Sequence, residues 1–125
     1  MSYTTHADLG GQLGHGPVRP EPEGELWHEP FEPAALALTL AMGGTGSWNI
    51  DQSRAARETL PDYAQLTYYR IWLAALVKLM AERGQVGEDE LAAGHALHPA
   101  VPVKRVLAAA DVPAAPARPA ARRPR

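Results

Sequence analysis

Glycine and proline, concentrated near the two ends of the chain, limit what it can fold into. The run GGQLGHGPVRPEPEGE at residues 10–25 cannot hold a helix, because proline breaks one and glycine weakens it. After Asp111 the residues are almost only Pro, Ala and Arg. We therefore predict an extended arm over residues 1–31, a helical body over residues 32–110 and a flexible basic tail over residues 111–125.

The arm carries apolar residues at intervals, which is unusual for a segment so rich in Gly and Pro. They are Leu9, Leu13, Val18, Leu26, Trp27 and Phe31. A body of about 80 residues cannot bury all of them, since small domains have little interior. The pattern favours an arm that lies on the surface of a partner, and the alternative is a disordered leader.

Within the body, the spacing of apolar residues indicates helices and no strands. We predict helices over about residues 33–42, 49–59, 62–83, 88–94 and 103–109. Ser47 or Asn49 can cap the second of them, and Pro61 separates it from the third. The predicted fold class is all-α: a small domain of three to five helices with two irregular ends.

Composition excludes several classes of protein. The 125 residues include no Cys, which rules out a disulfide scaffold and a thiolate metal site and is compatible with the cytoplasm. No apolar run is long enough for a membrane span, and the N-terminus is unlike a signal peptide. Residues 1–103 carry six basic and 13 acidic side chains, residues 104–125 six basic and one acidic. With no aromatic residues in the basic tail, we expect no nucleic-acid partner.

Few residues in the sequence are arranged for metal or acid–base chemistry. His95 and His98 are three residues apart and would share a helix face, but Pro99 follows at once, so a solvated helix end is the ordinary interpretation. The segment GGTGSWN at residues 43–49 lacks the Lys-Ser/Thr of a phosphate loop. We therefore predict that this chain binds no metal of its own.

Two stretches remain as candidates for a functional site. In the first, Arg54 lies at helical spacing from Asp51 and Glu58, and carboxylates that hold a guanidinium can aim it at an anion. Arg57 lies one turn further on and is a suitable comparison if it faces solvent. A solvated charged face is the alternative interpretation of this stretch.

The second stretch is aromatic and contains Tyr68, Tyr69 and Trp72. Aromatic residues at this spacing either pack in the core, with the tyrosine hydroxyls at its rim, or line a site.

Four separated blocks resemble the N-terminal half of the nitrile hydratase beta subunit. They are DLGGQLGHGPV (8–18), WHEPFEPAALALTLAM (27–42), GSWNIDQSRAARETLP (46–61) and YYRIWLAALVKLMAERGQVGEDEL (68–91). Each block alone is weak, but they occur in the family's order and with similar gaps. Thiocyanate hydrolases and the activator proteins of nitrile hydratases are built from related chains.

The resemblance implies hydration of a nitrile to an amide at a Co(III) or Fe(III) centre. That metal would lie in a partner, the alpha-type subunit, in a loop of three Cys of which two are oxidised. The beta-type chain would bind no metal and would supply arginines that donate hydrogen bonds to the oxidised sulfur groups.

Residue by residue, the resemblance assigns roles to both stretches. Arg54 matches one of the family's arginines that donate hydrogen bonds to the oxidised sulfur groups. It is the catalytic residue that we predict. The other matches are to positions bordering the substrate pocket: Ile50, Ser53, Tyr68, Tyr69 and Trp72. Ser53 is small where the family often has a bulky aromatic residue, which would enlarge the pocket for a bulky nitrile such as a nucleoside.

The chain departs from the family in length. An ordinary beta subunit is about twice as long and ends in a small barrel, so we expect the barrel on a separate chain. This arrangement resembles the three-subunit thiocyanate hydrolase and toyocamycin nitrile hydratase. The predicted function is a nitrile hydratase subunit that is inactive alone. The alternatives are a thiocyanate hydrolase subunit and an activator that delivers metal without joining the enzyme.

Overall fold

The computed structural model describes residues 6–7, 14 and 16–117, and the described part is helical, as predicted. Four α-helices follow in order: α1 (Glu32–Gly44), α2 (Ile50–Glu58), α3 (Tyr68–Glu82) and α4 (Glu88–Ala93). Two 3-10 segments, η1 (Tyr63–Gln65) and η2 (Ala109–Ala117), accompany them. The described residues form no strand, and none of their helices is long and apolar enough to cross a membrane.

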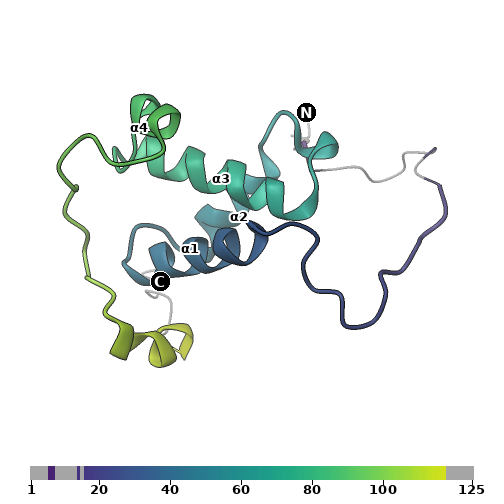
Figure 1. The fold of residues 1–125 in the computed structure, drawn as a ribbon, viewed down its shortest axis with the longest axis horizontal. Helices are drawn as coiled ribbons and strands as arrows, with labels where there is room; N and C mark the ends of the chain where they lie inside the picture. The colour runs from purple at the N-terminus through teal and green to yellow at the C-terminus, as the bar shows by residue number, and fades with distance from the viewer. Residues whose placement is uncertain (1–5, 8–13, 15, 118–125) are drawn as a thin grey trace, which may run out of the picture.

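Helix α3 is the centre of the domain, and α1 and α2 both pack against it (Figure 1). The buried apolar cluster consists of Trp48, Ala56, Leu60, Ile71, Ala75, Leu76 and Leu79. Trp48 comes from the loop between α1 and α2, so the core closes around that loop as well as between helices. Helix α1 buries two small residues, Ala35 and Thr39, and leaves Leu38 and Leu40 exposed.

The start of the third helix was predicted wrongly. Helix α3 begins at Tyr68 and not near residue 62. The chain makes one 3-10 turn at Tyr63–Gln65, and Leu66 and Thr67 then adopt extended backbone conformations. Leu66 packs against the core, and that packing outweighs the local preference for a continuous helix.

The last predicted helix, over residues 103–109, is also wrong. The backbone N–H of Arg105 donates to the carbonyl of Thr45 at 3.1 Å, just after the C-terminal end of α1. The segment thus pairs with the end of α1 and does not coil on itself. Helical turns appear later, as η2, and they include the first residues of the predicted tail; residues 118–125 lie outside the described part.

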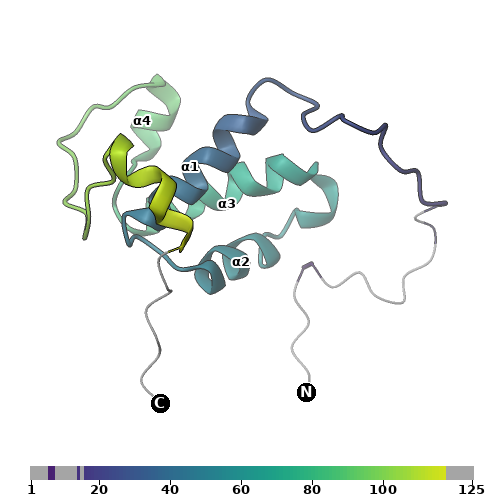
Figure 2. The same cartoon turned by 90° about the horizontal axis from the view of Figure 1, so that it is seen from below.

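The described part of the arm lies away from the helical body over much of its length (Figure 2). Val18 is 92% exposed and Leu26 is 71% exposed, so the described residues bury neither side chain. Trp27, by contrast, stacks on Tyr69 of α3 with ring centroids 5.3 Å apart. Leu9 and Leu13 fall outside the described residues.

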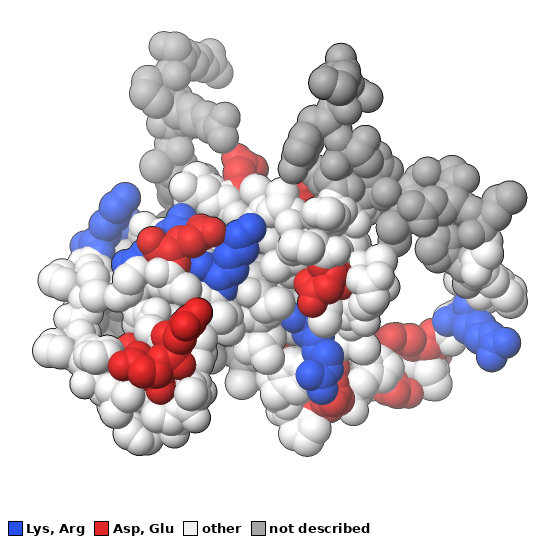
Figure 3. Space-filling view, turned by 90° about the horizontal axis from the view of Figure 1, so that it is seen from above, with Lys and Arg blue, Asp and Glu red and all other residues white. Residues whose placement is uncertain are grey.

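Charges are mixed on the face that Figure 3 shows. Acidic and basic side chains are interspersed there, and no broad patch of one sign appears on this face.

Candidate functional site

Helix α2 presents the first group of predicted site residues, and its start is fixed by a capping box. The Asn49 side chain accepts from the Gln52 backbone N–H at 2.8 Å, and the Gln52 side chain accepts from the Asn49 N–H at 2.9 Å. Asn49, not Ser47, is therefore the cap. This register places Ser53 and Ala56 on the buried face of α2 and Ile50 and Arg54 on its exposed face.

Arg54 is exposed one turn after Ile50, which is itself 68% exposed. The described residues include no ion pair between Arg54 and Glu58, so the predicted clamp by that carboxylate does not form in this chain. An exposed guanidinium beside an exposed apolar side chain is suited to contact with another molecule.

Arg57, proposed as the solvent-facing comparison, is half-buried and held on two sides. Its Nη1 donates to the Ser53 hydroxyl at 2.9 Å, and its guanidinium carbon lies 4.2 Å from the centroid of the Trp72 ring. Burial lowers the pKa of Arg57, and the positive charge of Arg54 lowers that pKa further. The i, i+4 spacing of Ser53 and Arg57 was visible in the sequence, whereas the contact with Trp72 on α3 was not.

Ser53 is buried at 5% exposure and its hydroxyl accepts the hydrogen bond of Arg57. The hydroxyl is thus engaged within the domain. Enlargement of the substrate pocket by a small residue at Ser53 stays a prediction.

Helix α3 places the aromatic residues of the second stretch next to α2. Tyr68 is 64% exposed, while Tyr69 and Trp72 are half-buried. Trp72 lies 6.1 Å from Tyr69 and 6.2 Å from Tyr68 between ring centroids, and Tyr68 meets Tyr69 edge-on at 4.9 Å. Burial raises the pKa of Tyr69, and the neighbouring Tyr68 raises it further.

An open cavity of about 650 Å³ lies between the arm and the start of α3. Of the predicted pocket residues, only Tyr68 and Tyr69 line it; Ile50, Ser53 and Trp72 do not. The rest of its wall is mainly acidic and includes Glu21, Glu25, Glu29 and Glu32 with His28. The hydrogen bond between His28 and Glu21 raises the pKa of the His28 imidazole. The same hydrogen bond joins two parts of the arm that lie seven residues apart in sequence.

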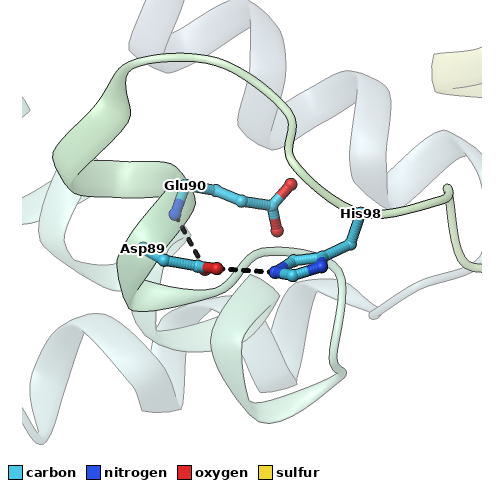
Figure 4. Close-up of side chains that lie close together, drawn as sticks. All are labelled: Asp89, Glu90 and His98. Carbon is cyan, nitrogen blue, oxygen red and sulfur yellow. Dashed lines mark hydrogen bonds and ion pairs between the residues drawn. The ribbon is translucent and has the colours of Figure 1, made fainter.

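One group of possible metal ligands occurs among the described residues, at α4 (Figure 4). Single ligand atoms of Asp89, Glu90 and His98 lie within 4.8 Å of one another. They already bond within the chain: Asp89 accepts from the backbone of Glu90 and from His98 at 2.6 Å, and Glu90 accepts from Gly87 and Leu97. These hydrogen bonds join α4 to the loop that follows it, and we call Asp89, Glu90 and His98 the clasp.

The clasp explains why the two histidines do not share a helix face. Helix α4 ends at Ala93, and Gly94 adopts a left-handed conformation with φ 75°. The chain then turns back so that His98 meets Asp89. The helix predicted over residues 88–94 is thus confirmed to within one residue at its end.

The clasp has a testable pH dependence. Its hydrogen bond and charge raise the pKa of His98 and lower the pKa of Asp89. The contact is therefore complete below the ordinary pKa of His, about 6.5; it is lost as pH rises through the raised pKa of His98. It is also lost in acid, as pH falls through the lowered pKa of Asp89.

We expect the NMR titration midpoint of the His98 ring to lie above that ordinary value and to fall toward it in Asp89→Asn. Glu88→Gln is the matched control, because Glu88 neighbours Asp89 on the same helix turn and makes no contact with His98. Equal midpoints in the parent and in Asp89→Asn would contradict the clasp.

Comparison with known proteins supplies a family. The family described as "Nitrile hydratase beta subunit, N-terminal" matches residues 3–122. The low-molecular weight cobalt-containing nitrile hydratase subunit beta of Rhodococcus rhodochrous is 38% identical over 86 residues, covering 67% of this chain and 38% of that protein. The nitrile hydratase subunit beta of Pseudomonas putida is 32% identical over 91 residues, covering 71% of this chain and 42% of that protein. The chain thus spans about two fifths of the length of these relatives.

Proposed function

The chain belongs to the nitrile hydratase beta subunit N-terminal family, and from that premise we propose that it is a subunit of an enzyme that hydrates a nitrile to an amide. The match over residues 3–122 carries the proposal, because it extends across both α2 and α3. Two relatives at 38% and 32% identity, each a nitrile hydratase beta subunit, support it.

The metal of the proposed enzyme belongs to an alpha-type partner. The relative from Rhodococcus rhodochrous is described as cobalt-containing. This chain has no Cys to form the proposed three-Cys loop, and the Asp89, Glu90 and His98 atoms are engaged in hydrogen bonds. This chain therefore does not supply the three-Cys donor set proposed to hold Co(III) or Fe(III). Bound in the partner, the metal would supply a Lewis acid for hydration.

This chain's proposed contribution lies on the exposed face of α2 and the start of α3. Arg54 would donate hydrogen bonds to the oxidised cysteine oxygens of the partner, for which a forked guanidinium is suited. Ile50 and Tyr68, both more than 60% exposed, would be covered by the partner at the same contact. Tyr69 and Trp72 would then lie next to Ile50 and Tyr68, at the edge of the substrate pocket.

The proposal also covers the rest of the assembly. From the family resemblance we extend the proposal to a three-subunit enzyme, of the kind of thiocyanate hydrolase and toyocamycin nitrile hydratase. The intact mass of each chain in the native complex tests this part directly. A single long chain containing these 125 residues would contradict it.

Co-expression with an alpha-type subunit that carries a three-Cys loop, and with the third chain of the proposed enzyme, tests the function. We expect a stable complex that contains stoichiometric cobalt or iron and hydrates nitriles, with no chain active alone. Turnover of thiocyanate in place of nitriles would favour the hydrolase alternative. Metal transfer to the alpha-type subunit without a lasting complex would favour an activator and contradict the proposal.

A further inference from the structure

Arg57 joins the two elements that carry the predicted site residues. It belongs to α2, where its Nη1 donates to Ser53 one turn earlier at 2.9 Å. Its guanidinium also lies over the ring of Trp72 on α3, 4.2 Å from the ring centroid. One planar group thus makes a hydrogen bond along one helix and a cation–π contact to the next.

The environment of Arg57 makes these contacts specific. Ser53 is buried, and Arg57 and Trp72 are both half-buried, so water competes less for the guanidinium than at the surface. No carboxylate among the described residues forms an ion pair with Arg57, although Glu58 is its neighbour in sequence. The guanidinium is therefore held by a hydroxyl and an aromatic ring, which fix its plane as well as its position.

Trp72 is in turn the end of a row of aromatic rings. It lies 6.1 Å from Tyr69, and Tyr69 lies 5.3 Å from Trp27 on the arm. Since Arg57 covers Trp72 and stands at the α2 end of this row, it limits the positions that the indole can take. A side chain fixed in this way can act as a rigid wall, whereas a free indole samples several rotamers.

We propose that Arg57 is a positioning residue that sets the substrate size accepted by the enzyme, by locking Trp72 between α2 and α3. This inference rests on the proposed function, in which Trp72 borders the substrate pocket. Arg57 touches no substrate and acts only through the indole. Binding of a bulky nitrile depends on Trp72 keeping its position, and binding of a small nitrile does not.

The test compares acetonitrile and benzonitrile in the complete complex. In Arg57→Met the long side chain remains, but the charge and the hydrogen bond are lost. We expect the KM for benzonitrile to rise by about threefold or more while the KM for acetonitrile stays within about twofold, because the released indole intrudes on the larger substrate. Ser53→Ala, which removes only the hydrogen bond, is expected to shift the same ratio in the same direction by less.

Arg83→Met is the matched control. Arg83 also stacks on an indole, that of Trp48 at 5.5 Å, and donates to a backbone carbonyl at 2.7 Å, but it lies at the other end of α3. The substitution of Arg83 should leave the ratio of the two KM values, for benzonitrile and acetonitrile, unchanged even if the domain is destabilised. Equal changes for both nitriles in Arg57→Met, or no change for either, would overturn the proposal.

A second measurement separates this inference from the proposed function. In NMR spectra of the full chain, the side-chain protons of Arg57 should be shifted upfield by the Trp72 ring, and the shift should vanish in Trp72→Leu. Absence of that upfield shift in the parent chain would overturn the positioning role whatever the complex catalyses. A parent complex without nitrile turnover, with the shift present, would contradict the proposed function alone.

Discussion

Arg54→Lys should leave the complex with the alpha-type partner assembled and reduce its nitrile turnover by about 10–100-fold. Lysine keeps the positive charge but loses the fork that can donate two parallel hydrogen bonds to an oxidised cysteine. Arg54 is exposed on α2 and has no ion pair with Glu58 to lose, so the substitution disturbs little within the chain itself. The measurements are kcat with a small nitrile and the elution volume of the complex.

Arg105→Lys is the matched control for Arg54. Arg105 is also exposed, and it lies against the end of α1, away from α2. Its substitution should leave kcat within about twofold of the parent. If Arg54→Lys behaves like Arg105→Lys, Arg54 is a solvated surface residue and its proposed role is wrong.

Leu76→Ala should lower the free energy of unfolding of the chain by about 2–5 kcal/mol. Leu76 is 4% exposed in the middle of α3, within the cluster that joins α3 to α2 and to Trp48. The free energy of unfolding of a small domain is only about 5–15 kcal/mol, so the substitution removes a large fraction of it. Urea unfolding followed by circular dichroism measures it.

Leu40→Ala makes the same chemical change on α1 at a side chain that is 63% exposed. Its effect on the free energy of unfolding of the isolated chain should stay within about 0.5 kcal/mol. Similar losses for both leucines would mean that α3 is not the centre of the core.

Several local features were predictable because they depend on neighbours in sequence. Asn49 caps α2 through a hydrogen bond with a residue three positions later. Helix α1, by contrast, continues two residues past its predicted end, through Gly43 and Gly44. The family resemblance came from the order of four sequence blocks, and the match over residues 3–122 confirms it.

The errors arose where a distant part of the chain decides the local conformation. Leu66 packs into the core and delays the start of α3. Arg105 pairs with the end of α1, which replaces a helix that the sequence around residue 103 would allow. In each case a contact made across the fold outweighs a propensity of well under 1 kcal/mol per residue.

The amino-acid sequence by itself determined the helical class and the irregular ends, because periodicity and capping act over a few positions. Only the tertiary structure decided which arginine is free and which is fixed. Arg54 and Arg57 have the same chemistry three residues apart, and helix geometry alone does not say which of them turns toward α3. The packing of Trp72 against α2 selects Arg57 for the half-buried position and leaves Arg54 at the surface.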